Sequence, residues 1–284
     1  DEARYDVSEL SFSNYLYLTS KGACPYIGLP IFPSRSFRHS AIYIRDDRGI
    51  TGPRDLAGRL VGVREFTMTA ALVARGMLED EFGVRSQDMR WCYGRADATD
   101  DVPIARVLPR DIDIEKIGDD ETLSDLLAEG RIDAMIAYKP PKAYVAGVPH
   151  FRRLFEDYPP LERDYYRRSG HFPIMHLIGV RRETLARDPG LAVRLCDAFQ
   201  QALDYSQARL IETQASYTML PWNAAEAARL KADFGALWRY GFNDNLEAIR
   251  TLCQYSLAQG IAARAVEPEE LFAPETIDWM APAA

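Results

Sequence analysis

Two threonines stand in a polar turn between a strand-like and a helix-like segment. The run Leu60–Val63 is short and rich in valine, as buried strands of parallel sheets are, and apolar residues recur at helical spacing after the turn. A helix that begins here presents free N–H groups and a positive dipole end, and no glycine-rich phosphate loop is present. We therefore expect Thr67, Met68 and Thr69 to bind a small anion such as a carboxylate. The alternative is that a threonine caps its own helix.

A second helix start resembles this turn. After the first strand-like segment, Ser11, Ser13 and Asn14 begin a helix-like segment. Each can cap that helix, or their side chains and N–H groups can hold an anion. Tyr138 and Lys139 follow another strand-like segment at its carboxyl end, where clefts lie in α/β folds. Lys139 either neutralises a carboxylate there or is an ordinary surface lysine.

Arg38, His39 and Ser40 stand directly before the strand-like segment at residues 41–45. Arg38 can bind a carboxylate through two parallel hydrogen bonds, which lysine does less well; otherwise it is a solvated surface cation. His39 is a candidate proton donor because the pKa of histidine lies near neutrality, and a structural histidine is the alternative. We expect Ser40 to contact the same ligand.

Three further titratable residues are candidates. His176 stands in an apolar strand-like run, where a lone histidine is commonly a hydrogen-bonded core residue; a place at the ligand site is the alternative. His171 is a weaker candidate for the same ligand site. Glu65 is a general acid only if burial raises its pKa. Otherwise it is a carboxylate that favours the positive end of a helix.

Composition narrows the classes of function. The chain has 284 residues, of which 47% are hydrophobic and 27% charged, and a net charge of −8 at pH 7. These values are ordinary for a globular protein, and the negative charge argues against nucleic acid or an anionic membrane as a partner. The four cysteines and four histidines lack the spacing of a zinc site or of a disulfide framework. Scattered reduced thiols favour the cytoplasm.

The order of the segments predicts an α/β fold. Repeated β-α-β units before residue 188 predict mostly parallel sheets covered by helices. Residues 188–265 predict three consecutive helices, with start signals at Asp188, Asn223 and Asn245. A helical C-terminal region should therefore follow the α/β part of the chain.

The strands fall into two groups, which predict two lobes with a ligand cleft between them. We expect lobe one to comprise residues 1–45 and 175–284, and lobe two to comprise residues 46–174. Closure of the lobes about the two crossings should bury a ligand. Since such a domain usually begins with its own strand and helix, and residue 1 is Asp, an N-terminal segment is expected to be missing.

The chain contains the segments YDVSELSFSNYL, FPSRSFRHSAIYIR, DLAGRLVGVREFTMTAALVARGMLEDEFGV and PIMHLIGVRRE. Together they resemble the 4,5-dihydroxyphthalate decarboxylase family over almost the whole chain, and FRHSAIYIR followed by VGV-x-E-x-x-MTAA is the most specific part. The resemblance implies a fold like that of the type-2 periplasmic binding proteins. Members usually carry proline where Arg64 stands and one βα unit before YDVSEL, in line with a missing N-terminal segment.

The resemblance also implies a reaction, the decarboxylation of 4,5-dihydroxyphthalate to 3,4-dihydroxybenzoate or of a related aromatic dicarboxylate. A hydroxyl para to the departing carboxylate can push electrons into the ring, so we expect no cofactor and no metal. The enzyme must supply a proton donor to the ring carbon. We expect His39 to be that acid and His176 to accept the proton of a phenol, with Glu65 as the other candidate acid.

Two other functions are alternatives. One is a solute-binding protein for a small organic or aromatic acid that serves an ABC-type transporter; it would be periplasmic, with a signal in the missing segment. The other is a dehydratase on the same fold that resembles those of menaquinone biosynthesis. Our preferred reading is a cytoplasmic enzyme whose partner is a small aromatic dicarboxylate, with no nucleic acid and no membrane as partners. A homo-oligomer is compatible with it.

Overall fold

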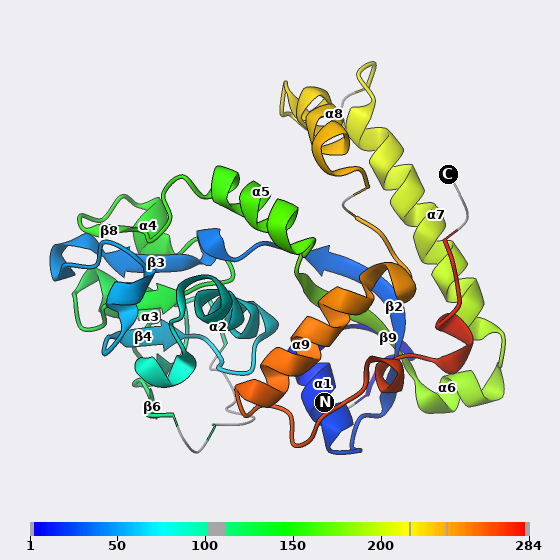
Figure 1. The fold of residues 1–284 in the computed structure, drawn as a ribbon, viewed down its shortest axis with the longest axis horizontal. Coiled ribbons are helices and arrows are strands. Elements are labelled where there is room, and N and C mark those ends of the chain that lie inside the picture. Colours follow the sequence, from blue (N-terminus) through cyan, green and yellow to red (C-terminus); the bar gives the residue numbers. More distant parts are fainter. Residues whose placement is uncertain (1–2, 102–108, 110–111, 216, 237, 282–284) are drawn as a thin grey trace.

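Two separate sheets form the framework of the protein (Figure 1). The computed structural model describes residues 3–101, 109, 112–215, 217–236 and 238–281. One sheet has three strands in the order β1–β9–β2. These strands are β1 (Val7–Ser11), β9 (Ile174–Arg181) and β2 (Tyr26–Arg35).

The other sheet has six strands in the order β6–β5–β4–β7–β3–β8. Its four strands from β6 to β7 run parallel, whereas β3 is antiparallel to both β7 and β8. The strands are β3 (Ile42–Arg45), β4 (Leu60–Val63), β5 (Arg90–Tyr93), β6 (Ile114–Lys116), β7 (Ala134–Ile136) and β8 (Phe151–Arg153).

The strand directions explain where the fold departs from the expected parallel arrangement. The six-stranded sheet is mostly parallel, as the β-α-β pattern predicted. In the three-stranded sheet, β9 is antiparallel to both β1 and β2. The reason is the path of the chain: β2 leads out towards the other sheet and β9 leads back, so the two must run in opposite directions.

The boundary between the sheets differs from the predicted one at residue 45. Strand β3 pairs with β7 and β8, so residues 42–45 belong to the six-stranded sheet. The outward crossing therefore precedes Ile42, because the chain turns at the short 3-10 helix His39–Ala41. The return crossing ends where β9 begins, at Ile174. Division of the chain into two lobes that move stays a prediction.

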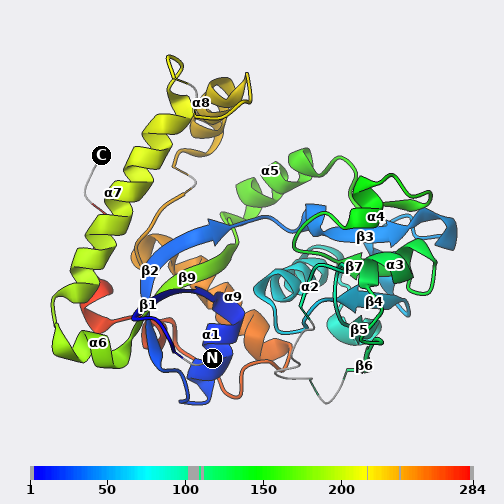
Figure 2. The same ribbon diagram turned by 180° about the vertical axis from the view of Figure 1, so that it is seen from behind.

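Helices pack on both sheets and the last three dominate the C-terminal part of the chain (Figures 1 and 2). As expected, three helices follow residue 188; Asn223 is the first residue of one, and Asn245 directly precedes another. Among the described residues, no helix is both long and apolar enough for a membrane crossing. The helices are α1 (Phe12–Ser20), α2 (Thr69–Phe82), α3 (Leu123–Ala128), α4 (Lys142–Val145), α5 (Tyr158–Ser169), α6 (Arg182–Arg187), α7 (Leu191–Ile211), α8 (Asn223–Phe234) and α9 (Leu246–Ala258).

Helix α2 lies between the two sheets and contributes to both hydrophobic cores. Leu72 and Val73 pack into the core of the three-stranded sheet, whereas Ala74 and Leu78 pack into the core of the six-stranded sheet. This double packing explains why the sequence of α2 is apolar on nearly all sides, because a helix buried all round lacks a polar face. The fully buried Arg75 is held by Gln259, the residue after α9, through a hydrogen bond from Nε of 2.7 Å.

Candidate functional site

The first turns of α1 and α2 meet, although the strands that precede them lie in different sheets. The hydroxyl of Thr69 in α2 accepts a hydrogen bond of 3.0 Å from the backbone N–H of Ser13 in α1. The same hydroxyl lies 2.9 Å from that of Ser11. Thr69 thus caps the opposing helix instead of its own, and α2 has no side-chain cap from its N-cap residue, Met68. The structure brings these predicted site residues together.

Buried polar atoms without partners surround this junction. The hydroxyl of Ser13, Oδ1 of Asn14 and Nε of Arg64, in the turn before α2, make no hydrogen bond within the described part of the chain. Buried polar groups are normally paired. Helix N-termini favour negative charge. The Ser13 hydroxyl and the Arg64 Nε–H are unused donors, which an anionic ligand requires, whereas Oδ1 of Asn14 can only accept a hydrogen bond.

Arg38 is a buried cation on the segment between β2 and β3. It is 9% exposed, and its Nε donates a hydrogen bond of 3.2 Å to Sδ of Met175. Among the described residues, no carboxylate forms an ion pair with it. Burial lowers the pKa of Arg38 to about 10, a shift that nearby Glu162 opposes, so the guanidinium is charged at neutral pH. A buried charge without a partner is costly, which supports the predicted role of Arg38 as a carboxylate ligand.

Strand register relates Arg38 to the junction of the helices. Its partner Met175 precedes His176 in β9, and His176 lies opposite Ser11 in β1. The six-stranded sheet also fixes the position of Arg38, which shortly precedes β3. Strand β3 runs antiparallel to β7 and begins beside the carboxyl end of β7, so Arg38 lies near the carboxyl edge of the parallel strands. Ligands in open α/β sheets bind at that edge.

Glu162 is a further candidate residue that the sequence did not single out. It lies in α5, and its Oε1 accepts a hydrogen bond of 3.3 Å from the backbone N–H of Ser40. The carbonyl of Ser40 accepts a hydrogen bond of 3.0 Å from Nε of Arg153, at the end of β8. Burial raises the pKa of Glu162, while Ser40, Arg38 and Arg153 oppose the shift. A carboxyl with a raised pKa next to a ligand-binding arginine is a candidate proton donor.

His39 does not have the environment expected of a proton donor. Its ring is 3% exposed and packs edge-on against Phe155 and Tyr165, with both centroid distances 5.4 Å. Its Nδ1 has no hydrogen-bond partner within the described chain. Burial lowers the pKa of His39 to about 4, so the ring is neutral at neutral pH. These contacts correct the acid role and favour the structural alternative.

His176 lies in a more polar place than its apolar neighbours suggested. Alternation along β9 buries Met175 and Leu177 and turns His176 to the other face. The side chain of His176 is 41% exposed, and Nδ1 lies 2.6 Å from Oε1 of Glu9. The expected desolvation of this ring is therefore wrong, although its position beside Ser11 keeps it near the junction of the helices.

Glu65, Thr67 and Met68 complete the turn before α2, and each has different contacts. Glu65 forms an ion pair of 3.0 Å with Arg64. Thr67 is buried, and Met68 packs against both hydrophobic cores. The backbone of this turn thus lies at the boundary between the two sheets.

Tyr138 and Lys139 follow β7, at the expected edge of the sheet, but both are engaged by one carboxylate. The Tyr138 hydroxyl and Lys139 Nζ each donate a hydrogen bond of 2.9 Å to Oδ1 of Asp100. The hydrogen bond to Asp100 raises the pKa of Lys139. Lys139 therefore already has a counter-ion in Asp100, and its binding of a substrate carboxylate stays a prediction.

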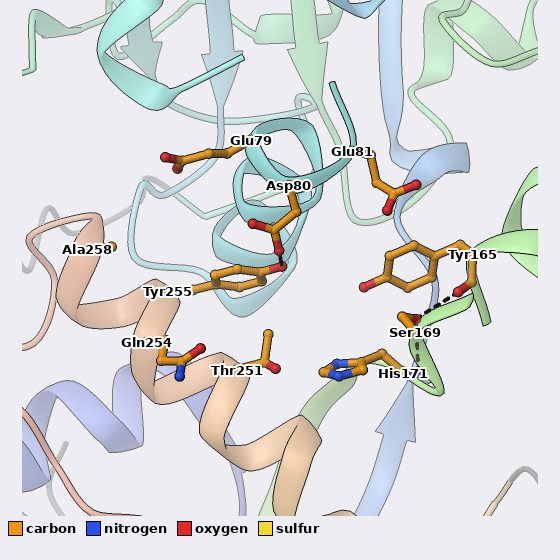
Figure 3. A pocket seen from close by; sticks show the side chains of 10 residues that line it. All are labelled: Glu79, Asp80, Glu81, Tyr165, Ser169, His171, Thr251, Gln254, Tyr255 and Ala258. Atoms are coloured by element: carbon orange, nitrogen blue, oxygen red, sulfur yellow. Dashed lines mark hydrogen bonds between the residues drawn. The ribbon is translucent and has the colours of Figure 1, made fainter. Parts of the chain in front are cut away.

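His171 lies apart from the helix junction, in a cavity of about 340 Å³ between α2, α5 and α9 (Figure 3). Its neighbours there include Asp80 and Tyr255, whose hydroxyl donates to that carboxylate. Burial lowers the pKa of His171. Because the lining also includes Glu79 and Glu81, this cavity is unsuited to a dianion. His171 also lines a second cavity together with Arg35 and Arg239, and its role as a substrate ligand stays a prediction. Within the described residues, no three His, Cys, Asp or Glu side chains are grouped to hold a metal ion.

Comparison with curated proteins identifies two relatives, while no protein-family model matches the chain. A 4,5-dihydroxyphthalate decarboxylase of Comamonas testosteroni is 37% identical over 278 residues, which cover 97% of this chain and 84% of the relative. A 4,5-dihydroxyphthalate decarboxylase of Pseudomonas putida is 41% identical over 166 residues, which cover 58% of this chain and 64% of the relative.

Solved structures share the fold at low sequence identity. The periplasmic aliphatic sulphonate-binding protein SsuA of Escherichia coli has a TM-score of 0.54 and 13% identity, and the match covers 95% of this chain and 76% of that one. The desulfurization enzyme DSZB has a TM-score of 0.53 and 16% identity, and the match covers 96% of this chain and 84% of that one. The fold is thus that of the periplasmic binding proteins, as the sequence predicted. By its identity to the Comamonas relative along nearly its whole length, the chain belongs to the 4,5-dihydroxyphthalate decarboxylase family.

Proposed function

We propose that this protein decarboxylates a dihydroxylated aromatic dicarboxylate, with 4,5-dihydroxyphthalate as the reference substrate and 3,4-dihydroxybenzoate as its product. The observation that carries the proposal is Arg38, a buried guanidinium with no ion-pair partner in the described chain. Both curated relatives carry the name of this activity. The substrate would supply the anion that Arg38 lacks.

Two anion sites suit a substrate with two carboxylates. One carboxylate would bind Arg38 through charge-assisted hydrogen bonds. The other would bind at the N-termini of α1 and α2, where the Ser13 hydroxyl is an unused donor. The two sheets would act as lobes that close over the ring, since the site takes residues from both.

Glu162 is the proton donor in this proposal. Loss of CO₂ requires a proton on the ring carbon that bears the departing carboxylate. The para hydroxyl pushes an electron pair into the ring as Glu162 transfers its proton to that carbon. The carbon–carboxylate bond then breaks, its electron pair restores the aromatic ring, and CO₂ leaves. Glu162 is left as a carboxylate beside the Ser40 N–H and takes a proton from solvent before the next turnover.

The decisive experiment measures CO₂ release and ring product from purified protein with 4,5-dihydroxyphthalate and with phthalate. Only the first should react, because phthalate lacks the electron-donating hydroxyl. Glu162→Gln should lower kcat at least about 10²-fold and leave substrate affinity within a few-fold. Glu156→Gln, at an exposed glutamate near α5, is the matched control and should retain activity.

Binding without CO₂ release would favour the alternative, a solute-binding protein for an aromatic acid. Full activity of Glu162→Gln would reject Glu162 as the acid while leaving the decarboxylase proposal intact. We also propose a cytoplasmic location, because all four cysteines are free thiols, as expected in a reducing compartment. Fractionation of cells that express the full-length protein tests this point.

A further inference from the structure

Helices α7 and α8 form an arm that projects from the body of the molecule (Figures 1 and 2). Thirteen large hydrophobic residues are exposed among those described, and seven of them fall between residues 205 and 222. This concentration at one end of the arm is not a random scatter of surface side chains. The seven, called here the arm patch, are Tyr205, Leu210, Ile211, Tyr217, Met219, Leu220 and Trp222.

Three members of the arm patch lie together. Leu210 at the end of α7 and Met219 and Leu220 before α8 line the same hollow, of about 330 Å³. Trp222, the residue before α8, is 78% exposed. A hollow lined in part by apolar side chains, next to a protruding aromatic residue in the sequence, is typical of an interaction surface.

Local contacts hold the patch in one shape. The guanidinium of Arg209 lies over the rings of Tyr205 and Tyr217, at 5.7 and 5.6 Å from their centroids. The side chain of Asn223 donates a hydrogen bond of 2.5 Å to the carbonyl of Leu210, which ties the start of α8 to the end of α7. Association would therefore order few new side chains, which lowers its entropic cost.

Helix α8 of the arm contacts α5. Arg163 of α5 forms an ion pair of 2.9 Å with Glu226 of α8. The rings of Tyr166 in α5 and Phe234 in α8 pack edge-on with centroids 5.0 Å apart. One side of α8 is thus occupied by α5, whereas the arm patch faces away from any described residue that could cover it.

We propose that the arm patch is the surface through which two copies of this chain form a dimer. The seven side chains expose roughly 900 Å², since one fully buried aromatic side chain accounts for 150–250 Å². A stable interface needs about 800 Å² on each partner, whereas the largest apolar patch of a typical monomer is about 300–600 Å². The area on one arm therefore matches half of a dimer interface.

The charge of the patch favours a second copy over other partners. The charged residues within residues 205–222 are the half-buried Arg209 and the exposed Glu212. Such a neutral, mixed surface is complementary to itself when two arms meet about a two-fold axis. An anionic membrane or a nucleic acid would require a basic surface, whereas this chain has a net charge of −8.

The test is light scattering coupled to size-exclusion chromatography, at concentrations from about 1 to 100 μM, the range of moderate dimer affinities. Wild-type protein should have twice the mass of the chain. Trp222→Glu and Met219→Glu should each raise the dimer Kd at least about tenfold. Val145→Glu, which introduces the same charge at an exposed apolar residue of α4, should leave the mass unchanged. Circular dichroism should show that all variants are folded.

Two results would overturn the proposal. One is a wild-type protein that is monomeric at every concentration, and the other is an oligomer that both arm variants leave intact. Flotation with neutral phosphatidylcholine vesicles checks the competing partner. Monomeric protein that floats with vesicles through Trp222 would assign the patch to a lipid surface and reject the dimer.

Discussion

The hydroxyl of Thr69 accepts a hydrogen bond from the backbone N–H of Ser13, 56 residues away and preceded by a strand of the other sheet. A side chain at the first residue of α2 thus fills one place at the N-terminus of α1 that an anion would otherwise take. A carboxylate that binds here must share this N-terminus with Thr69 or displace its hydroxyl. The contact therefore couples ligand binding to the distance between the two sheets.

Thr69→Val should weaken both the fold and the site. The valine keeps the shape of the side chain but leaves the Ser13 N–H without its acceptor, which costs about 1–3 kcal/mol. Urea unfolding should show this loss. Thr67→Val is the matched control, because the Thr67 hydroxyl bonds to no described residue although it is equally buried. Equal stability of the two variants would contradict a structural role for the contact between Thr69 and Ser13.

Arg38→Met should separate stability from binding. A methionine fills similar space without a buried charge, so the free energy of unfolding should stay constant or rise. Affinity for the dicarboxylate should fall by about 1.5–3 kcal/mol, the strength of a charge-assisted hydrogen bond. Isothermal titration with wild type, Arg38→Met and Arg38→Lys tests this, with Lys a partial rescue. Unchanged affinity of Arg38→Met would remove Arg38 from the site.

The sequence predicted the local structure around the candidate site. A strand followed by a polar turn and an apolar helix identified the N-termini at Ser11 and Thr69, because strand ends and helix starts are readable from periodicity. Arg38 was identified by its position before a strand near a crossing. The sequence pattern could not predict the hydrogen bond between Thr69 and Ser13, because this contact depends on how the two sheets face each other.

Long-range contacts account for the errors. Ser40 and Glu162 are 122 residues apart, and nothing near Glu162 in the sequence distinguishes it from a solvated helix residue. Lys139 looked free because its partner, Asp100, follows a different strand. His39 was a candidate acid because the pKa of histidine lies near neutrality and because it adjoins Arg38, whereas Phe155 and Tyr165 cover its ring from other segments.

The burial of His39 predicts a dependence of stability on pH. Its folded pKa of about 4 lies below the ordinary value of 6.5. As pH falls below 6.5, the unfolded chain binds a proton that the folded chain does not, so the fold loses stability. The loss should grow until about pH 4 and reach about 2–3 kcal/mol. The charged groups that act on His39 are Glu81 in α2 and Arg168 in α5, with opposing effects.

His39→Phe is the variant that isolates this effect. Phenylalanine keeps an aromatic ring beside Phe155 and Tyr165 but cannot titrate. Denaturant unfolding between pH 7 and 4 should show a shallower loss of stability than in wild type. The variant should also release CO₂ at a rate within a few-fold of wild type, because Glu162 is the proposed acid. Abolished turnover with intact substrate binding would restore His39 as the proton donor.

Gly76→Ala should destabilise the contact between α2 and α9. A Cβ at residue 76 would lie 2.3 Å from a ring carbon of Tyr255, far inside van der Waals contact. The ring cannot move away freely, because the Tyr255 hydroxyl is bonded to Asp80 (Figure 3). Overpacking of this kind costs about 1–3 kcal/mol, which outweighs the gain of up to about 1 kcal/mol from replacing glycine inside a helix. Thermal or urea unfolding should therefore show a net loss of stability.

Two further variants make the Gly76 prediction specific. Gly52→Ala is the control, because a Cβ there meets no atom within 4 Å and the backbone is extended; its stability should match wild type or exceed it slightly. In a Tyr255→Leu background the obstructing ring atoms are gone, so Gly76→Ala should be neutral or stabilising, and the double-mutant cycle should give a coupling of about 1–3 kcal/mol. Equal destabilisation by Gly76→Ala in both backgrounds would show that the cost arises within α2 and not from its packing against α9.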